Sequence, residues 1–201
     1  GSKSTLEDLA YLKSSGFVEM IMRCKRMGKT IVGICGGFQM LGKTLEDPHA
    51  VESSLKSIPG LGLLDVDTQF SKKKATSQVE AEELTDSNNP PDRLRGYEIH
   101  MGQTDRLGGS ALFDVFEQNG VSCRTEDGCI TLNSKIAGTY IHGLFDNPSI
   151  TRQWLQLIGL GHIDIPSAYG YVAKEKAYDL LADHFKNHVD MEKLNQILQR
   201  V

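Results

Sequence analysis

Residues 30–42 read TIVGICGGFQMLG and hold the features that decide the fold. The run Thr30–Ile34 is mostly β-branched, which is typical of a short buried strand, and the residues behind it are typical of a helix. Cys35 lies between the two, with Gly33 and Gly36 close on either side. A cysteine at a tight turn from strand to helix matches a nucleophile elbow, with sulfur in place of the usual serine oxygen. The stretch therefore predicts an α/β fold that presents Cys35 at an exposed turn at the carboxyl end of a strand.

The predicted turn also suits covalent catalysis. The N-terminus of the following helix would favour the Cys35 thiolate, and the amide N–H of Gly36 would stabilise an oxyanion. A thiol nucleophile needs a base that takes and returns its proton. His142 is the best candidate, because it follows the strand-like run 136–141 and precedes Gly143. It should lie at the same carboxyl edge of the sheet as Cys35.

The other histidines and cysteines fit ordinary structural roles. His100 alternates with Glu98 on one strand face, which indicates either a polar pair that supports the site or part of a binding wall. Surface or hydrogen-bonded positions are expected for His49, His162, His184 and His188. No C-x-x-C pair indicates a metal site, so reduced thiols that act as small buried residues are expected at Cys24, Cys123 and Cys129.

A second motif overlaps the predicted elbow. Residues 37–44 satisfy the Walker A pattern G-x-x-x-x-G-K-[ST], and Leu63–Asp65 could serve as a Walker B strand. A phosphate-binding loop must expose its backbone N–H groups, whereas Phe38, Met40 and Leu41 are bulky apolar residues that suit a helix packed on a sheet. Nucleotide binding is therefore the less favoured alternative.

Composition sets the broad class of the protein. The chain has 201 residues, of which 39% are hydrophobic and 24% charged, enough for one globular domain with a helical appendage. Its formal charge of −4 offers no basic excess for nucleic acid. There is neither a membrane-spanning apolar run nor a signal-peptide pattern, so we expect a cytoplasmic protein with no membrane partner.

The periodicity of apolar residues predicts the remaining elements. Two helices broken at Gly16 are expected within residues 5–27, and a helix should run from Pro148 to about residue 158. Residues 174–199 are predicted to be strongly helical with a buried apolar face, and residues 82–92 to form an exposed polar connection. Strands are expected at 61–70, 75–81, 97–101, 121–124, 129–132 and 136–141.

Residues 33–42 resemble the G-x-C-x-G-x-Q-x-L-G nucleophile motif of class I, triad-type glutamine amidotransferases. Other segments, in the same order, narrow the resemblance to the amidotransferase domains of cobyric acid synthases, and together they cover nearly the whole chain. These segments are residues 1–9, 47–53, 60–64, 96–102 and 138–146.

The resemblance implies a flavodoxin-like, three-layer α/β sandwich with a mostly parallel central sheet and helices on both faces. It implies glutamine hydrolysis through a thioester on Cys35 with His142 as base, oxyanion donors from Gly36 and the Gly1-Ser2 turn, and a glutamine pocket shaped in part by Gln39. No metal or cofactor is expected in this domain. The ammonia would pass to a synthetase domain or subunit that uses ATP and magnesium to amidate carboxylates of a corrinoid in cobalamin biosynthesis.

The chain departs from the family pattern in two places. Most triad-type amidotransferases carry a glutamate two residues after the catalytic histidine, where this chain has Leu144, so Asp146 or a backbone carbonyl is expected to orient His142. The chain also begins inside the family's P-G-S-K-N-T motif. The first strands and the synthetase domain are therefore expected to lie outside it, and Gly1-Ser2 is either native or the remnant of an expression tag. A non-catalytic docking module is the remaining alternative.

Overall fold

The computed structural model describes residues 2–84 and 93–199. It divides into two compact units, Gly1–Leu144 and Phe145–Val201. The sequence predicted one domain with a helical appendage, and the boundary falls two residues after His142. Cys35 and His142 therefore both belong to the N-terminal unit. The predicted polar connection at 82–92 lies mostly outside the described residues.

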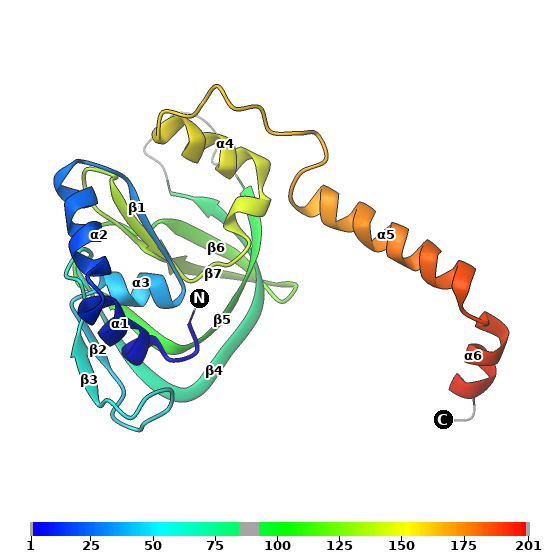
Figure 1. Cartoon of the computed structure of the whole chain (residues 1–201), viewed down its shortest axis with the longest axis horizontal. Coiled ribbons are helices and arrows are strands. Elements are labelled where there is room, and N and C mark those ends of the chain that lie inside the picture. The colour runs from blue at the N-terminus through cyan, green and yellow to red at the C-terminus, as the bar shows by residue number, and fades with distance from the viewer. Residues whose placement is uncertain (1, 85–92, 200–201) are drawn as a thin grey trace. The chain divides into compact units, whose positions relative to one another are not determined.

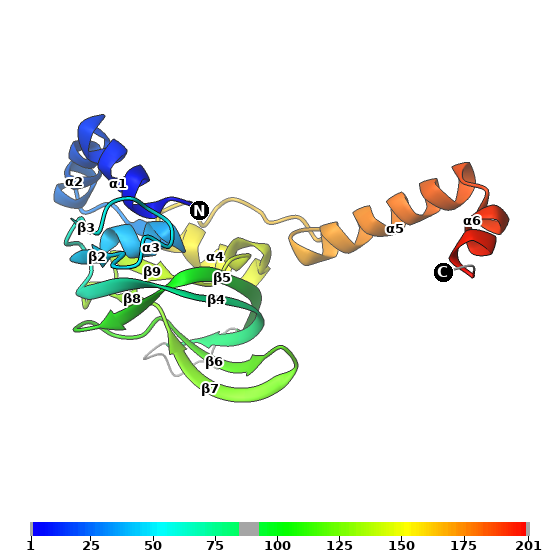
Figure 2. The same cartoon turned by 90° about the horizontal axis from the view of Figure 1, so that it is seen from below.

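The N-terminal unit opens with two short helices, α1 (Thr5–Ser14) and α2 (Phe17–Arg26). Gly16 separates them with a φ of 82°, a left-handed conformation that glycine adopts without steric cost. The predicted break at Gly16 is confirmed. Figure 2 shows both helices at one end of the unit, with α3 and strands β8 and β9 in its middle and the β6–β7 hairpin at the other end.

A small sheet carries the predicted elbow. Strand β1 (Ile31–Ile34) pairs in parallel with β9 (Ile136–Thr139), which pairs antiparallel with β8 (Cys129–Ile130). Helix α3 (Gly36–Leu41) follows β1 directly and packs against β1 and β9. A Cβ at Gly33 would lie 2.6 Å from the carbonyl carbon of Gly37, so this close strand-to-helix approach requires a glycine.

The second sheet is built on two long strands, β4 (Val66–Glu83) and β5 (Arg93–Arg106), which pair antiparallel and curve around one side of the unit (Figure 1). One continuous β4 replaces the two shorter strands predicted at 61–70 and 75–81, with an irregularity between Phe70 and Ala75 where the sequence suggested a break. The sheet is completed by β2 (Thr44–Glu46), β3 (Ser57–Pro59), β6 (Phe113–Gln118) and β7 (Val121–Asp127).

The α/β class is confirmed, but among the described strands parallel pairing is found only for β1 with β9 and β2 with β4. The other pairs are antiparallel, and they include the hairpins β2–β3 and β6–β7, whose consecutive strands pair antiparallel. The parallel pair that matters for the site is β1 with β9. Both strands end at the same edge, and this edge carries Cys35 and His142.

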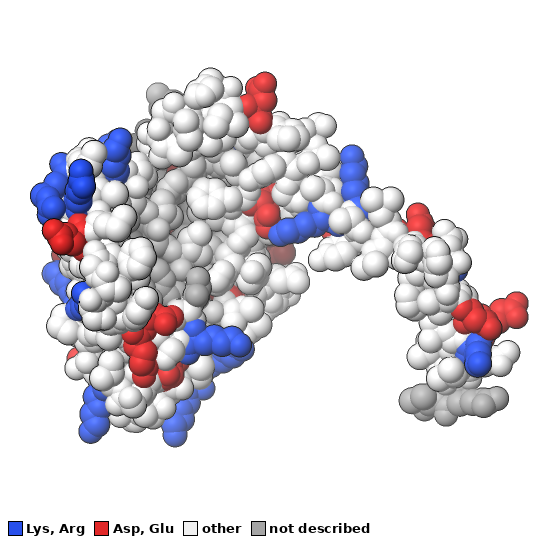
Figure 3. Space-filling model, viewed as in Figure 1, with Lys and Arg blue, Asp and Glu red and all other residues white. Residues whose placement is uncertain are grey.

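The hydrophobic core lies between the first helices, α3 and the two sheets. Buried side chains from α1, α3, β4 and β9 form one cluster that includes Leu6, Leu9, Phe38, Leu41, Val66, Phe70 and Ile136. Phe38, which the sequence placed on a packed helix, is 2% exposed and contacts Tyr140 edge to face with ring centroids 5.3 Å apart. This core anchors α3 behind the elbow. Figure 3 shows charged side chains mainly around the rim of this unit on the face drawn.

The C-terminal unit is helical. It holds α4 (Pro148–Leu157), α5 (Tyr171–His188) and α6 (Met191–Leu198). The predicted continuous helix over 174–199 is interrupted at Val189–Asp190, where the Asp190 side chain caps α6 by accepting from Lys193 N at 2.9 Å. The expected buried face is wrong: α5 and α6 contain no buried residue, and Leu180 is 71% exposed. No helix in the described part of the chain has the length and apolar character needed to cross a membrane.

Candidate active site

Cys35 forms the turn between β1 and α3 with φ 55° and ψ −115°. A left-handed φ is strained for a residue other than glycine and costs about 1–3 kcal/mol. Backbone hydrogen bonds hold it there, because Cys35 N donates to Thr139 O at 2.8 Å and Gln39 N donates to Cys35 O at 3.1 Å. The strained turn has the geometry of the predicted nucleophile elbow.

The Cys35 thiol is buried rather than exposed as the sequence suggested, with 7% of the residue accessible. Its Sγ donates to Ile99 O on β5 at 3.6 Å. Burial raises the pKa of Cys35, the carboxylate of Glu52 raises it further, and the backbone N–H of Gly36 opposes both. The first amide of the helix thus acts in the predicted direction, toward the thiolate, but burial outweighs it, so the pKa of the Cys35 thiol is raised rather than lowered.

His142 lies where the sequence placed it, at the end of the strand next to β1. The parallel register pairs Ile34 with Thr139, so Cys35 and the segment Tyr140–His142 leave the sheet at the same edge. Burial lowers the pKa of His142, and the charge on His100 lowers it further. The lowered pKa favours the neutral imidazole, which is the form that can accept a proton.

Two backbone amides lie near the elbow. A Cβ built on Gly36 would be 3.4 Å from Ser2 N and 3.2 Å from Ser2 Cβ, so the start of the chain runs directly beside the first turn of α3. Ser4 N donates to Ser2 Oγ at 3.0 Å, and the Ser2 hydroxyl donates to Asp8. The expected oxyanion donors Gly36 and Ser2 are thus brought together, while Gly1 lies outside the described residues.

A loop over residues 47–53 anchors the start of the chain. The buried carboxylate of Asp47 accepts from Val51 N at 2.7 Å and from Glu52 N at 2.8 Å, and these bonds lower its pKa against the effect of burial. Glu52 then accepts from Thr5 Oγ1 at 3.1 Å, and Ser4 Oγ donates to Glu52 O at 3.3 Å. The loop therefore fixes the segment that carries Ser2, a role that local sequence patterns did not reveal.

Gln39 is buried at 2% exposure, so it does not face an open pocket. Its Nε2 donates to the Tyr140 hydroxyl at 3.1 Å, and Tyr140 Oη lies 2.5 Å from Thr104 Oγ1. The ring of His100 stacks on Tyr140 with centroids 3.7 Å apart. Gln39 is thus tied to Tyr140 and, through Tyr140, to Thr104 and His100. The parts played by Tyr140 and Thr104 were not predicted, because their partners are distant in sequence.

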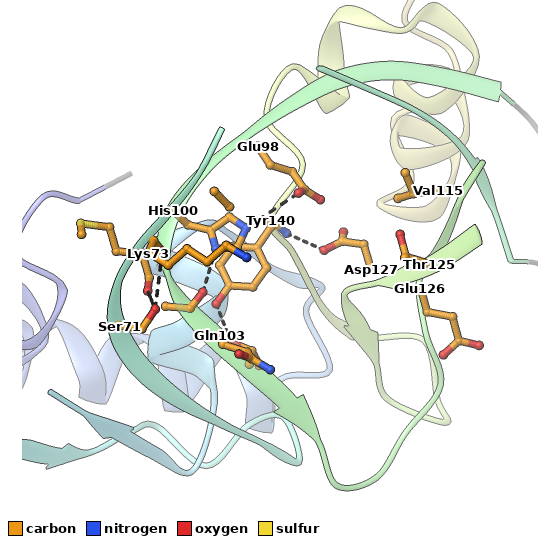
Figure 4. Close-up of a pocket in the computed structure, with 14 residues that line it drawn as sticks. Ser71, Lys73, Glu98, His100, Gln103, Val115, Thr125, Glu126, Asp127 and Tyr140 are labelled. Atoms are coloured by element: carbon orange, nitrogen blue, oxygen red, sulfur yellow. Dashed lines mark hydrogen bonds and ion pairs between the residues drawn. The ribbon is translucent and has the colours of Figure 1, made fainter. Parts of the chain in front are cut away.

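A cavity of about 350 Å³ lies on the inner side of the curved second sheet. Figure 4 shows Glu98, His100, Asp127 and Tyr140 on its walls. His100 Nε2 is 3.8 Å from Glu98 Oε2. Glu98 and His100 therefore form both a polar pair and a cavity wall, the two alternatives that the sequence left open. The walls of this cavity do not include Cys35 or His142.

Asp127 is a functional candidate that the sequence did not reveal. Its Oδ1 accepts from Tyr140 N at 3.2 Å, and its Oδ2 accepts from the Thr139 hydroxyl. Thr139 Oγ1 in turn accepts from Ile141 N at 3.0 Å. Asp127 thus orders the end of β9 immediately before His142. Burial raises its pKa to about 6, against the hydrogen bond from Thr139.

Asp146, the residue expected to orient His142, belongs to the C-terminal unit. Its carboxylate forms an ion pair with Lys174 of the same unit. Leu144, at the position of the family's usual glutamate, is 1% exposed. The orientation of His142 by Asp146 stays a prediction.

The structure contradicts the phosphate-loop alternative. Residues Gly36–Leu41 form helix α3, and Thr44 begins β2, so the Walker-like residues do not form an open loop. Lys43 is paired with Asp65 at 2.5 Å on the surface. The sequence predicted that the other cysteines act as small buried residues. This is confirmed for Cys129, which is buried, and wrong for Cys24, which is exposed on α2.

Residues 1–150 match the model of the CobB/CobQ-like glutamine amidotransferase domain family. Curated relatives named cobyric acid synthase include the protein of Syntrophobacter fumaroxidans, which is 41% identical over 98% of this chain and 40% of the relative's own length. The relative from Limosilactobacillus reuteri is 44% identical over 99% of this chain and 40% of its own length. The chain thus spans about two fifths of the length of these relatives. A solved glutamine amidotransferase structure from Thermotoga maritima, 18% identical, aligns over 78% of this chain and 57% of that chain with a TM-score of 0.44.

Proposed function

Because the chain belongs to the family of CobB/CobQ-like glutamine amidotransferase domains, we propose that it hydrolyses glutamine through a thioester on Cys35. The observation that carries the proposal is the position of Cys35. It occupies a strained turn with a φ of 55° at the end of β1, and His142 follows β9, the parallel neighbour of β1. This arrangement brings a nucleophile and a base to one edge of the sheet.

The proposed reaction starts from a neutral thiol on Cys35 and a neutral imidazole on His142. His142 takes the proton of Cys35, and the sulfur attacks the side-chain amide carbon of glutamine to form a tetrahedral intermediate. The amides of Gly36 and Ser2 stabilise its oxyanion. The imidazolium returns the proton to the leaving nitrogen, so ammonia departs and a glutamyl thioester remains. Water, deprotonated by His142, then attacks the thioester and releases glutamate and the free thiol.

The ammonia has a defined use in this proposal. A synthetase domain or subunit, supplied with ATP and magnesium, would use it to amidate corrinoid carboxylates in cobalamin biosynthesis. The relatives named cobyric acid synthase, in which this chain aligns to about two fifths of the length, support this assignment. A cytoplasmic location is part of the proposal, because ATP and a reduced nucleophilic thiol are both maintained there. Transfer of ¹⁵N from the glutamine amide into a corrinoid amide by the complete protein tests this part.

Glutamate release by the 201-residue chain tests the glutaminase site. We expect Cys35→Ser to abolish the reaction, because a neutral hydroxyl is a far weaker nucleophile. Cys123→Ser is the matched control, since Cys123 is a half-buried thiol on β7 that donates to Val115 O at 3.5 Å. It should keep most of the activity. Equal loss in both variants, with intact circular dichroism spectra, would remove Cys35 from the role of nucleophile.

A further inference from the structure

The His142 ring has an aromatic partner. Tyr97 of β5 stacks on the imidazole with ring centroids 5.0 Å apart and an angle of 8° between the planes. The stack therefore holds the imidazole by its face.

The backbones of the two residues are also joined. His142 N donates to Tyr97 O at 2.8 Å, and Tyr97 N donates to His142 O at 3.1 Å, which makes an isolated antiparallel bridge. Gly96 makes the approach possible, because a Cβ there would lie 2.6 Å from His142 O and 2.4 Å from Ile141 Cγ2. Tyr97 thus fixes both the position of the His142 backbone and the plane of its ring.

The same stretch of β5 contacts the nucleophile. Ile99 O, two residues beyond Tyr97, accepts the hydrogen bond from Cys35 Sγ. Residues two apart on an extended strand are separated by about 7 Å, so β5 sets the spacing between its two contacts. The backbone groups of Tyr97 and Ile99 that contact His142 and Cys35 lie on one edge of β5. The other edge of β5 pairs with β4.

We propose that Tyr97 is the positioning residue that holds the His142 imidazole for proton exchange with Cys35, a role that other triad-type enzymes give to a carboxylate. The inference rests on the proposed function. Stacking restricts rotation of the ring and leaves both nitrogens accessible, whereas a carboxylate would occupy one nitrogen. It also adds no negative charge beside the ring, so the imidazole stays neutral and ready to accept a proton.

Three variants separate stacking from other roles. Tyr97→Phe keeps the ring face, Tyr97→Leu removes it, and Tyr97→Met is a second non-aromatic choice if the leucine variant fails to fold. Tyr97 is 43% exposed, so the loss of core packing is small. Tyr11→Leu on α1 is the matched control, because Tyr11 is 64% exposed in the same unit.

Two readouts are needed. The first is kcat and KM for glutamine hydrolysis. The second is the rate at which iodoacetamide alkylates Cys35, followed by mass spectrometry of the tryptic peptide 30–43, which contains no other cysteine. Alkylation requires a proton to leave Cys35 but requires no glutamine. It therefore tests the pairing of Cys35 with His142 even if the chain does not hydrolyse glutamine, and His142→Asn sets the lower limit of the rate.

We expect Tyr97→Leu to lower kcat about fivefold with little change in KM, and to slow alkylation of Cys35 by a similar factor, since an aromatic stack is worth about 1 kcal/mol. Tyr97→Phe and Tyr11→Leu should match the wild type. The proposal is overturned if the leucine variant alkylates at the wild-type rate, or if Tyr97→Phe is equally impaired. It is also overturned if only KM changes, or if His142→Asn does not slow alkylation. If the alkylation pattern holds but Cys35→Ser leaves glutamine hydrolysis by the complete protein unchanged, the proposed function alone is refuted.

Discussion

Replacing Asp127 by Asn should change how the stability of the N-terminal unit depends on pH. Burial raises the pKa of Asp127 from 3.8 to about 6, and the charge on Glu98 contributes, while the hydrogen bonds from Thr139 and Tyr140 act in the opposite direction. The folded state therefore binds the proton of this carboxyl more tightly than the unfolded state does. Asparagine has nearly the same shape and does not titrate.

The size of the effect follows from the shift. A rise in pKa from 3.8 to about 6 corresponds to about 3 kcal/mol, at 1.36 kcal/mol per pKa unit. Because the folded-state pKa is raised, this contribution is fully present below about pH 4 and is lost as the pH rises through 6. Between pH 4 and pH 7.5, the wild type should therefore lose about 3 kcal/mol of unfolding free energy relative to Asp127→Asn.

Urea unfolding followed by circular dichroism measures this difference, with the β-sheet signal as the readout, because strands β1 to β9 lie in the N-terminal unit. Carboxylates that do not interact with Asp127 affect both proteins equally, so the difference between their unfolding free energies at each pH reports on Asp127 and its coupling to Glu98. Asp105→Asn, at an exposed position on β5, is the matched control. A difference that stays constant from pH 4 to pH 7.5, or that changes in the opposite direction, would refute the reasoning.

Three further predictions concern the site. The pKa of His142 lies below its ordinary 6.5 and that of Cys35 lies above 9.0, so kcat/KM should be flat across neutral pH and fall in acid as His142 is protonated. Assays from pH 5 to 9 that show a continuous rise would contradict a neutral thiol paired with a neutral imidazole. Gly96→Ala places a Cβ 2.6 Å from His142 O, so displacement of His142 should lower glutaminase kcat at least tenfold, and an unchanged kcat would count against the bridge. Lys43→Ala breaks the surface ion pair with Asp65 and should leave the urea unfolding midpoint nearly unchanged, because exposed ion pairs contribute little to stability. Calorimetry should find no magnesium-ATP binding in either protein, and micromolar binding lost in the variant would restore the phosphate-loop alternative.

The local pattern around Cys35 predicted much of the site's framework. The strand, the turn and the helix over residues 30–42 could be read from β-branched residues, glycines and helical apolar spacing, which act over a few residues. The position of His142 followed from the rule that parallel strands carry functional groups at their carboxyl ends. Both predictions depend only on nearby residues and on one strand pairing.

The remaining features depend on contacts that are distant in sequence. Burial raises the pKa of the Cys35 thiol, and its Sγ donates to Ile99 O on β5, although the local turn and helix suggested a thiolate. The stack of Tyr97 on His142 joins residues 45 positions apart, and no periodicity reports it. Similarly, apolar spacing predicted a buried face for α5 and α6 that the described structure does not contain. Spacing shows which side chains share a face but not what covers them.

Covalent trapping at Cys35 tests the central claim most directly. The glutamine analogue that carries a diazoketone in place of the carboxamide should alkylate the nucleophile once it occupies the glutamine site. We predict one adduct per chain in the tryptic peptide 30–43, protection by glutamine, and a much slower reaction in His142→Asn. Labelling of the exposed Cys24 in place of Cys35, or labelling of Cys35 that glutamine does not prevent, would contradict the account.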